Sequence, residues 1–261
     1  MILIEDFEVT GLDHAIRGMR NPMNSWNKSD SGICKGGDSG IGCANCAANP
    51  CSHGYNHSFQ IGKNDHELMI KLVKGGPVHA KFRRMIAVYV DITAPLYWWK
   101  EFDTYKVGTV ANSCSTMHKI HEKEFTLDDF SHEHLINRDE GWDDVTCSME
   151  NEEVVLYNCS SMDILQLTCN MLNFYRNLYL KESHPDDVEI DWWQMIQLLP
   201  ASYNQKQTIM LNYEVLANIY KSRRNNKLDE WYALCDWIEK LPYSELIIGE
   251  TPKFNISKEE L

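Results

Sequence analysis

Residues 85–93, MIAVYVDIT, form the stretch that decides the fold. Apolar and polar side chains alternate along it, which predicts a strand with one buried face. The residues predicted on that face are Ile86, Val88, Val90 and Ile92. An aromatic run follows at 96–102, LYWWKEF, and Pro95 suits the first position of the helix predicted there.

The sequence changes in character directly after this aromatic run. Residues 100–118 read KEFDTYKVGTVANSCSTMH, and most of the second half is small or hydroxylated. Apolar cores are not built from such residues. A dense row of small hydrogen-bonding groups directly after the most aromatic helix therefore needs another explanation.

The remaining chain predicts a mixed α/β (α+β) domain covering 1–261. Residues 1–28 read as a strand, a turn and a short helix, and apolar periodicity predicts further helices in the C-terminal half. Two segments interrupt the pattern: a Cys-rich, Gly-rich insertion at 29–64 and an acidic surface excursion at 122–153. The predicted helices span 65–74, 160–181, 191–199, 208–222 and 228–241.

Composition limits the possible functions. The chain has 25 Lys and Arg against 38 Asp and Glu, a formal charge of −13. General nucleic-acid binding is not expected, because phosphate contacts need clustered cations. No stretch approaches ~18 uninterrupted apolar residues, so no membrane span is predicted. The acidic N-terminus is unlike a signal peptide, and we expect a cytoplasmic protein.

The Cys-rich insertion holds four cysteines and two histidines within 24 residues. Cys43 and Cys46 have the spacing that lets two thiolates bind one metal ion. We predict a structural zinc site, with an iron–sulfur cluster as the second choice. The candidate ligands are Cys34, Cys43, Cys46, Cys51, His53 and His57. The alternative is a flexible loop with incidental free thiols.

Two further features suggest ligand contacts. Residues 69–89 carry His79, Arg83, Arg84 and three lysines but no acidic residue, which suits an anion such as a phosphate. Asn212 lies within the predicted helix 208–222, where asparagine has a poor propensity. The alternatives are a solvated basic surface and an ordinary surface asparagine.

Together these residues resemble the flavin-dependent thymidylate synthases. In that family a helix that starts at an Ala-Pro-like step leads to an Arg-His-Arg triplet, which falls on 104–106, Thr-Tyr-Lys, in this chain. The following run, VGTVANSCSTMH, aligns with the family's ligand-binding run. Cys114 takes the place of its Ser, or Ser113 does if the register shifts by one residue.

The C-terminal half carries the second part of the resemblance. The family has a Leu-Pro step, an Asn-x-x-x-Leu helix and an Arg, and this chain has Leu199-Pro200, Asn212 with Leu216, and Arg223. His79 stands near the family's Gly-His, and GLDHAIRGMR at 11–20 is similar to its opening. The resemblance covers most of the chain outside the two interrupting segments.

The resemblance implies a central antiparallel sheet flanked by helices, and a function. It implies methylation of a deoxyuridylate-type pyrimidine nucleotide, with methylenetetrahydrofolate as methylene donor, reduced FAD as hydride source and NADPH as reductant. No catalytic nucleophile is needed. The residues implied at the flavin are His79, Lys106, Asn212 and Arg223. Those implied at the nucleotide are Asn112, Ser113, Cys114, Arg83 and Arg84.

The resemblance also implies a homo-oligomer, a tetramer, because the family's sites form between subunits. The aromatic run 96–102 offers apolar surface for such contacts. Several charged positions are lost, however. Only Lys106 keeps a positive charge in the triplet, and Asn112, Thr116 and Ile196 replace a Glu and two Arg. The alternative is therefore a non-catalytic relative that acts as a binding or regulatory protein.

Overall fold

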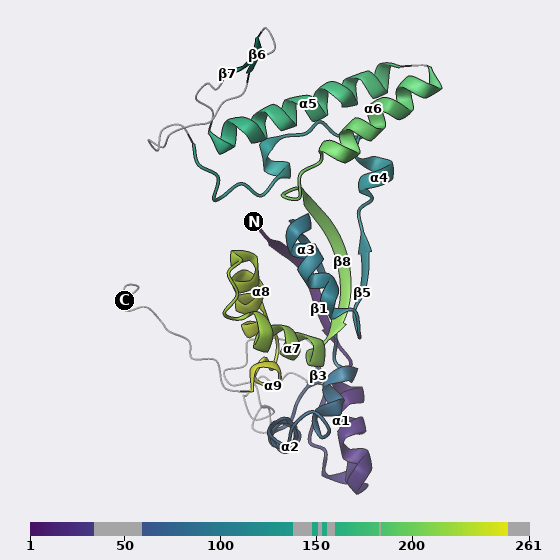
Figure 1. Ribbon diagram of the computed structural model, residues 1–261. Helices are drawn as coiled ribbons and strands as arrows, with labels where there is room; N and C mark the ends of the chain where they lie inside the picture. Colours follow the sequence, from purple (N-terminus) through teal and green to yellow (C-terminus); the bar gives the residue numbers. More distant parts are fainter. Residues whose placement is uncertain (34–58, 138–147, 151–152, 156–159, 183, 250–261) are drawn as a thin grey trace, which may run out of the picture. The chain divides into compact units, whose positions relative to one another are not determined.

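The computed structural model describes residues 1–33, 59–137, 148–150, 153–155, 160–182 and 184–249. Its main sheet has four strands in the order β1-β4-β8-β5 (Figure 1). The architecture is α/β, with an antiparallel sheet flanked by helices, as predicted. The strands are β1 (Leu3–Thr10), β4 (Ala87–Pro95), β5 (Val110–Ser113) and β8 (Asn204–Asn212).

The predicted central strand is confirmed as β4. Ile86, Val88, Val90 and Ile92 are all at most 1% exposed, whereas Tyr89 between them is 46% exposed. This is the alternation that a strand with one covered face requires. The helix α3 (Leu96–Phe102) follows at once, with Pro95 as the residue before the helix rather than its first residue.

The chain divides into two compact units. Unit 1 comprises Met1–Leu3, Ile92–Thr104 and Asn112–Gln207, and unit 2 comprises Ile4–Asp91, Tyr105–Ala111 and Thr208–Leu261. A boundary between the units falls within each of the four strands β1, β4, β5 and β8. A single domain over 1–261 stays a prediction.

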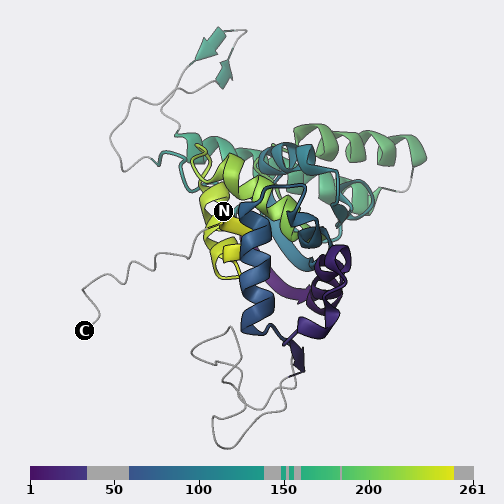
Figure 2. The ribbon, with the colours of Figure 1, turned by 90° about the horizontal axis from the view of Figure 1, so that it is seen from below.

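Unit 1 is built around a helical hairpin. α5 (Ser161–Lys181) and α6 (Pro185–Leu198) pack along each other (Figures 1 and 2). Ser160 begins α5 with a capping box, in which its hydroxyl and Asp163 satisfy each other's backbone N–H groups. Short elements complete the unit: α4 (Thr116–Lys119), the 3₁₀ turns η5 (Asp103–Tyr105) and η6 (Leu127–Asp129), and the paired strands β6 (Ser148–Glu150) and β7 (Glu153–Val155).

Two sequence expectations for unit 1 need correction. Phe125 and Phe130 are 5% and 2% exposed and lie in the core cluster with Leu165, Leu172 and Met195. The start of the acidic segment is therefore anchored by buried rings rather than running over the surface. The aromatic helix α3 also buries Trp98, Trp99 and Phe102 inside the chain, so it does not offer the predicted oligomer surface.

Unit 2 contains the remaining helices. They are α1 (Leu12–Arg20), α2 (Lys63–Lys74), α7 (Tyr213–Arg223), α8 (Asp229–Glu239) and α9 (Glu245–Ile248), with the 3₁₀ segments η1 (Asn21–Met23), η2 (Trp26–Lys28) and η4 (Ala80–Met85). The predicted helix 208–222 is wrong at its start. Residues 208–212 belong to β8, because Ile209 and Leu211 are buried with the alternation of a strand.

The Cys-rich insertion lies mostly outside the described residues. Its described ends pair as two short antiparallel strands, β2 (Gly32–Ile33) and β3 (Phe59–Gln60). The predicted metal ligands Cys34, Cys43, Cys46, Cys51, His53 and His57 all fall outside what the structure describes. Within the described ranges no group of three or more His, Cys, Asp or Glu side chains is placed to hold a metal ion.

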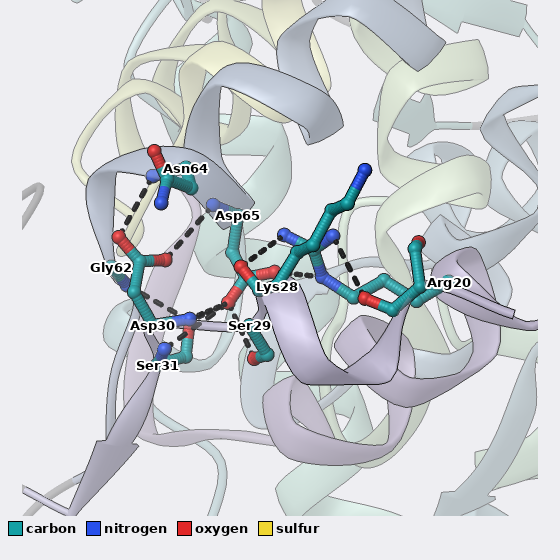
Figure 3. Close-up of polar contacts among 9 residues, drawn as sticks. Arg20, Lys28, Ser29, Asp30, Ser31, Gly62, Asn64 and Asp65 are labelled. Carbon is teal, nitrogen blue, oxygen red and sulfur yellow. Dashed lines mark hydrogen bonds and ion pairs between the residues drawn. The ribbon is translucent and has the colours of Figure 1, made fainter. Parts of the chain in front are cut away.

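A buried ion pair joins three segments of unit 2 (Figure 3). Arg20 Nε donates to Asp65 Oδ1 at 2.6 Å, and the two side chains are 5% and 0% exposed. The other Asp65 oxygen accepts from the hydroxyls of Ser29 and Ser31 and from the Asp30 and Ser31 backbone N–H groups. These bonds fix the end of α1, the loop at 29–31 and the start of α2 to one another.

The same network caps α2. The Asp30 carboxylate accepts from the backbone N–H groups of Asn64 and Asp65, at 2.9 and 3.1 Å. Burial alone would raise the pKa of Asp65, but hydrogen bonds from Ser31, Ser29 and Arg20 outweigh it and lower the pKa. Asp65 is therefore charged in the folded protein at neutral pH.

Among the described residues, no helix is long and apolar enough to cross a membrane.

We predict that Asp65→Asn lowers the free energy of unfolding by about 3–5 kcal/mol at pH 7, because it leaves Arg20 buried without its counter-charge. Urea denaturation of both proteins measures the difference. A folded-state pKa below the ordinary value of about 3.9 means that this stabilisation is present above pH ~4 and is lost as the pH falls through the folded pKa. The difference between the two proteins should therefore shrink at acid pH.

The control for this prediction is Glu122→Gln, which removes an exposed carboxylate paired with Lys119. Its unfolding curve should match that of the original protein, because exposed ion pairs contribute little. A loss for Asp65→Asn no larger than that for Glu122→Gln would contradict the prediction.

Candidate functional site

Asn212, which the sequence analysis singled out, directly precedes helix α7 of unit 2. Asn212 is extended, and its side-chain oxygen accepts from the backbone N–H groups of Glu214 and Val215, at 3.0 and 3.1 Å. It is the N-cap of α7 rather than an interior helical residue. This role explains an asparagine with poor helical propensity without any ligand.

Gly108 brings the polar segment, residues 100–118, against the N-cap residue Asn212. Its φ of +83° is one that side-chain-bearing residues rarely adopt. A Cβ atom added there would lie 3.0 Å from Asn212 Nδ2 and 3.2 Å from Val215 Cγ2. The turn at 105–109 therefore runs closely over the first turn of α7, and only glycine meets both requirements.

Arg223 occupies the other end of α7, where it is held by aromatic rings. Its Nε donates to the Tyr105 hydroxyl at 3.0 Å, and its guanidinium lies 4.7 Å from the centre of the Trp231 ring. The guanidinium also lies 5.7 Å from the Tyr105 ring. Such cation–π contacts stabilise a desolvated arginine. Arg223 therefore has a structural role within the chain.

The basic run 71–84 is only partly available to an anion. Arg84 is paired with Glu214 in the first turn of α7, and Arg83 donates to the Leu246 backbone oxygen at 3.3 Å. Arg83 Nε is buried and has no hydrogen-bond partner among the described residues. Burial lowers the pKa of Arg83, although Glu214 acts in the opposite direction. His79 is exposed.

The expected flavin residues do not form one cluster. Asn212 and Arg223 stand at opposite ends of α7, and their eleven-residue spacing separates them by about 16 Å along the helix axis. Lys106 is exposed and lies in the turn between the two ends. Asn212 and Arg223 are both committed to contacts inside unit 2, so the exposed cation Lys106 and the imidazole of His79 are better placed for an external anion.

Unit 1 contains a cleft of about 340 Å³ beside the end of the polar segment. Its lining includes the adjacent segments 114–116 and 203–206. The Cys114 N–H donates to the Lys206 oxygen at 2.9 Å, and the Gln205 side chain donates to the Cys114 oxygen at 2.8 Å. Both strand ends are therefore held rigidly at the cleft.

The cleft combines apolar surface with hydroxyl and charged groups, and its two lysines stand against two aspartates. It offers hydroxyl groups on Ser115, Thr116 and Tyr203, and ammonium groups on Lys123 and Lys206. Ser115 accepts from the His118 N–H at the start of α4, which leaves its hydroxyl proton for a ligand.

Two aspartates oppose the lysines of the cleft. Asp128 and Asp129 both line it, and Lys123 is paired with Asp129. Burial raises the pKa of Tyr203, and the charges of Asp129 and Cys114 raise it further, so its hydroxyl stays protonated. Hydroxyl, amide and ammonium groups together suit a sugar or base edge. They do not provide the excess positive charge that a phosphate requires.

The expected nucleotide residues are divided between the two units of the chain. Cys114 lines the unit 1 cleft, Asn112 and Ser113 are exposed on β5, and Arg83 and Arg84 belong to unit 2. Sequence reasoning missed Lys123, Tyr203 and Lys206. Tyr203 directly precedes β8 and Lys206 lies within it, so they could have been located only by recognising the strand at 204–212.

No protein-family model and no curated protein matches this sequence. Solved structures do. The chain is similar to Thymidylate Synthase X (ThyX) from Helicobacter pylori with FAD and dUMP, with a TM-score of 0.56 and 15% identity over 96% of this chain and 97% of that one. A second structure of the ThyX from Helicobacter pylori with FAD and dUMP gives 0.55 and 16% over 95% and 97%.

A UMP/dUMP methylase, PolB from Streptomyces cacaoi, bound with 5-Br dUMP, gives a TM-score of 0.50 with 12% identity, over 92% of this chain and 89% of that one. The chain therefore has the fold of the flavin-dependent thymidylate synthases, as its sequence resemblance predicted.

We predict that Gly108→Ala destabilises the protein more than Gly76→Ala does. Both glycines have a positive φ, +83° and +90°, so both substitutions carry the backbone cost of roughly 1–2 kcal/mol. Only at Gly108 would the added carbon also press on Asn212 and Val215, whereas nothing lies within 4 Å at Gly76. Thermal unfolding of the two variants measures the difference, and equal losses would show that the turn does not pack on α7.

Proposed function

We propose that the protein is a divergent flavin-dependent thymidylate synthase-like enzyme that methylates a deoxyuridylate-type pyrimidine nucleotide. The observation that carries this proposal is the end-to-end match to ThyX, over 96% of this chain and 97% of that one. Related folds host different activities, so the activity itself needs its own test.

The proposed cofactors follow the resemblance. When bound, reduced FAD would supply a hydride and methylenetetrahydrofolate a methylene group, with NADPH as reductant. The chain's own part would be to bind, orient and exclude water. Lys106 and His79 fit flavin phosphates, since both are exposed and able to donate. Asn212 and Arg223 fit less well, because each already has a partner within unit 2.

For the nucleotide, we propose the unit 1 cleft. Cys114, Ser115 and Thr116 would contact the base and sugar, whereas Lys123 and Lys206 only balance Asp128 and Asp129. Asn112, Ser113, Arg83 and Arg84 stay predicted nucleotide contacts. A homotetramer, a cytoplasmic location and a zinc ion in the Cys-rich insertion also stay predictions.

The alternative is a non-catalytic relative that keeps the fold as a binding or regulatory protein. One observation favours it: Arg223, the arginine with both the family spacing and the family residue type, is held by Tyr105 and Trp231. Tyr105 itself stands within the segment where the family has its Arg-His-Arg triplet. A change from ligand binding to internal packing would give this arrangement.

Flavin binding and turnover separate the two functions. We expect the purified protein to bind FAD with quenched flavin fluorescence, and to release tritium from 5-tritiated dUMP only when methylenetetrahydrofolate and NADPH are present. Flavin binding without tritium release supports the non-catalytic alternative. A protein that cannot be reconstituted with FAD contradicts the proposed enzyme.

We predict that Thr116→Arg strengthens dUMP binding by about tenfold or more. The change adds a cation to the wall of the proposed nucleotide cleft, and a hydrogen bond to a charged group contributes about 1.5–3 kcal/mol. Titration calorimetry with dUMP measures the affinity. The matched control is His118→Arg, which adds the same group to the same short helix at a residue that does not line the cleft. Equal affinities in the two variants would show that the dUMP phosphate does not lie in this cleft.

We also predict that Arg223→Ala lowers the melting temperature, because Arg223 is held by Tyr105 and Trp231. A flavin contact at this residue, as the resemblance implies, would in addition weaken FAD binding by about 1.5–3 kcal/mol. The control is Arg224→Ala, which removes ion pairs to Asp236 and Glu239 at the same end of α7. Fluorescence titration with FAD, together with a thermal melt of each variant, measures both effects. If FAD binding is unchanged while the melting temperature falls, Arg223 serves the fold and not the ligand.

A further inference from the structure

Unit 2 contains a pocket of about 600 Å³ beside the buried pair of Arg20 and Asp65, whose polar contacts Figure 3 shows. The end of α1, the 3₁₀ turn η2 with the loop after it, and the first two turns of α2 line this pocket. We call it the α2 pocket. Its volume lies within the range of about 300–1,000 Å³ that is typical of small-molecule sites. Its lining includes Arg20, Asn27, Lys28, Asp30, Asn64 and Leu68.

The two carboxylates at the α2 pocket already accept hydrogen bonds from the chain itself. Asp65 is fully buried and accepts from Arg20, from two serine hydroxyls and from two backbone N–H groups. Asp30 accepts from the backbone N–H groups of Asn64 and Asp65, one on each oxygen. An ionised carboxylate has about four acceptor sites, so these two leave little acceptor capacity for a ligand.

The groups that stay available at the pocket are mainly donors. Among the described residues, the side chains of Asn27, Lys28 and Asn64 take part in no hydrogen bond or ion pair. The Lys28 side chain extends away from the hydrogen-bonded network (Figure 3). Arg20 uses three of its five N–H groups in the described part of the chain, two of them in contacts of 3.2 and 3.3 Å to backbone oxygens. A ligand that fits here presents acceptor oxygens.

The charges at the pocket match one negative charge on the ligand. Arg20 and Asp65 neutralise each other, and Asp30 lies at the N-terminal end of α2, where the helix dipole is positive. Within the described ranges, Lys28 is then the lining cation without a counter-charge. One ammonium group suits a carboxylate. A phosphate carries about −1.5 to −2 charges and is typically bound by more than one cation.

Two side-chain amides and one apolar side chain define the rest of the ligand. Asn27 and Asn64 each offer an amide donor and an amide acceptor, which together complement another amide group. Leu68 lies one turn after Asn64 on the same face of α2 and is partly buried. It therefore offers an apolar contact next to the polar groups.

We propose that the α2 pocket binds a monocarboxylate that carries an adjacent amide and an apolar side chain. The carboxylate lies against Lys28, the amide against Asn27 and Asn64, and the apolar group against Leu68. A free N-acylated amino acid and the C-terminal residue of a peptide share this chemistry. The α2 pocket and the unit 1 cleft have no lining residue in common, and the proposal does not depend on the proposed enzymatic activity.

Titration calorimetry of the full-length protein with N-acetyl-L-leucine tests the proposal. We expect saturable binding with a Kd below about 1 mM. N-acetyl-L-leucinamide lacks the negative charge and should bind at least about tenfold more weakly, because a hydrogen bond to a charged group is lost. N-acetylglycine lacks the apolar side chain and should also bind about tenfold more weakly.

Lys28→Met removes the ammonium group and keeps an apolar stem. It should weaken the binding of N-acetyl-L-leucine tenfold or more and leave that of the leucinamide unchanged. The matched control is Lys63→Met, since Lys63 is exposed at the first position of α2 but does not line the pocket. This variant should bind N-acetyl-L-leucine like the original protein. Both lysines are exposed, so neither change should alter the melting temperature.

Two further variants keep the proposal testable if Lys28→Met does not fold. Asn27→Asp places a carboxylate at an exposed position of the lining and should weaken the binding of N-acetyl-L-leucine tenfold or more. Leu68→Ala shortens the apolar contact and should reduce the preference for N-acetyl-L-leucine over N-acetylglycine. Neither effect is expected from a lysine that binds anions without selectivity.

An N-acetylated peptide of three glycines followed by leucine separates the two sources of the ligand. Tighter binding of this peptide than of N-acetyl-L-leucine supports a peptide C-terminus, and equal or weaker binding supports a free acid. Three outcomes would overturn the carboxylate site: no saturable binding of any acid, equal binding of N-acetyl-L-leucine and its amide, or equal affinities in Lys28→Met and Lys63→Met.

Discussion

The buried pair of Arg20 and Asp65 is the interaction on which unit 2 depends. Neither charge has enough water around it to be stable alone, so each requires the other. The remaining Asp65 oxygen accepts from Ser29 and Ser31, and this ties the loop at 29–31 to the start of α2. The ends of the Cys-rich insertion, paired through β2 and β3, lie directly beside these anchored segments in the sequence. The charge pair in the core therefore anchors the segments next to the described ends of the insertion.

The same use of arginine recurs through the described part of unit 2. Arg84 pairs with Glu214, Arg223 with Tyr105 and Trp231, and Arg224 with Asp236. In a chain of charge −13, these arginines already bind groups of the chain itself, so they are less available to an anionic ligand. An anionic ligand would then depend on exposed lysines such as Lys106. Lysine binds phosphate as a point charge and cannot form the bidentate hydrogen bonds of arginine, so we expect the phosphate to be oriented less strictly.

The sequence predicted those elements whose local signals agree with their tertiary environment. The alternation in β4 and the apolar periodicity of the helix predicted at 160–181 were both sufficient, because burial and backbone hydrogen bonding there follow the local pattern. The start of α7 was misplaced because Ile209 and Leu211 suit either a helix or a strand, and only the pairing of β8 decides between them. The lysines of the unit 1 cleft carry no local signal, since a cleft is formed by segments that are distant in sequence.

Fold and function are encoded by different residues of the polar segment 100–118. The backbone course requires Gly108, with its positive φ and its close approach to Asn212, and this requirement is independent of any ligand. The charged groups that the resemblance expects nearby can change without moving the backbone, and Thr104, Asn112 and Thr116 show that they have changed. A fold can therefore persist at 15% identity to ThyX while its ligand contacts diverge. The question of activity in this chain is consequently one of side-chain charge in the cleft and around α7, and not one of architecture.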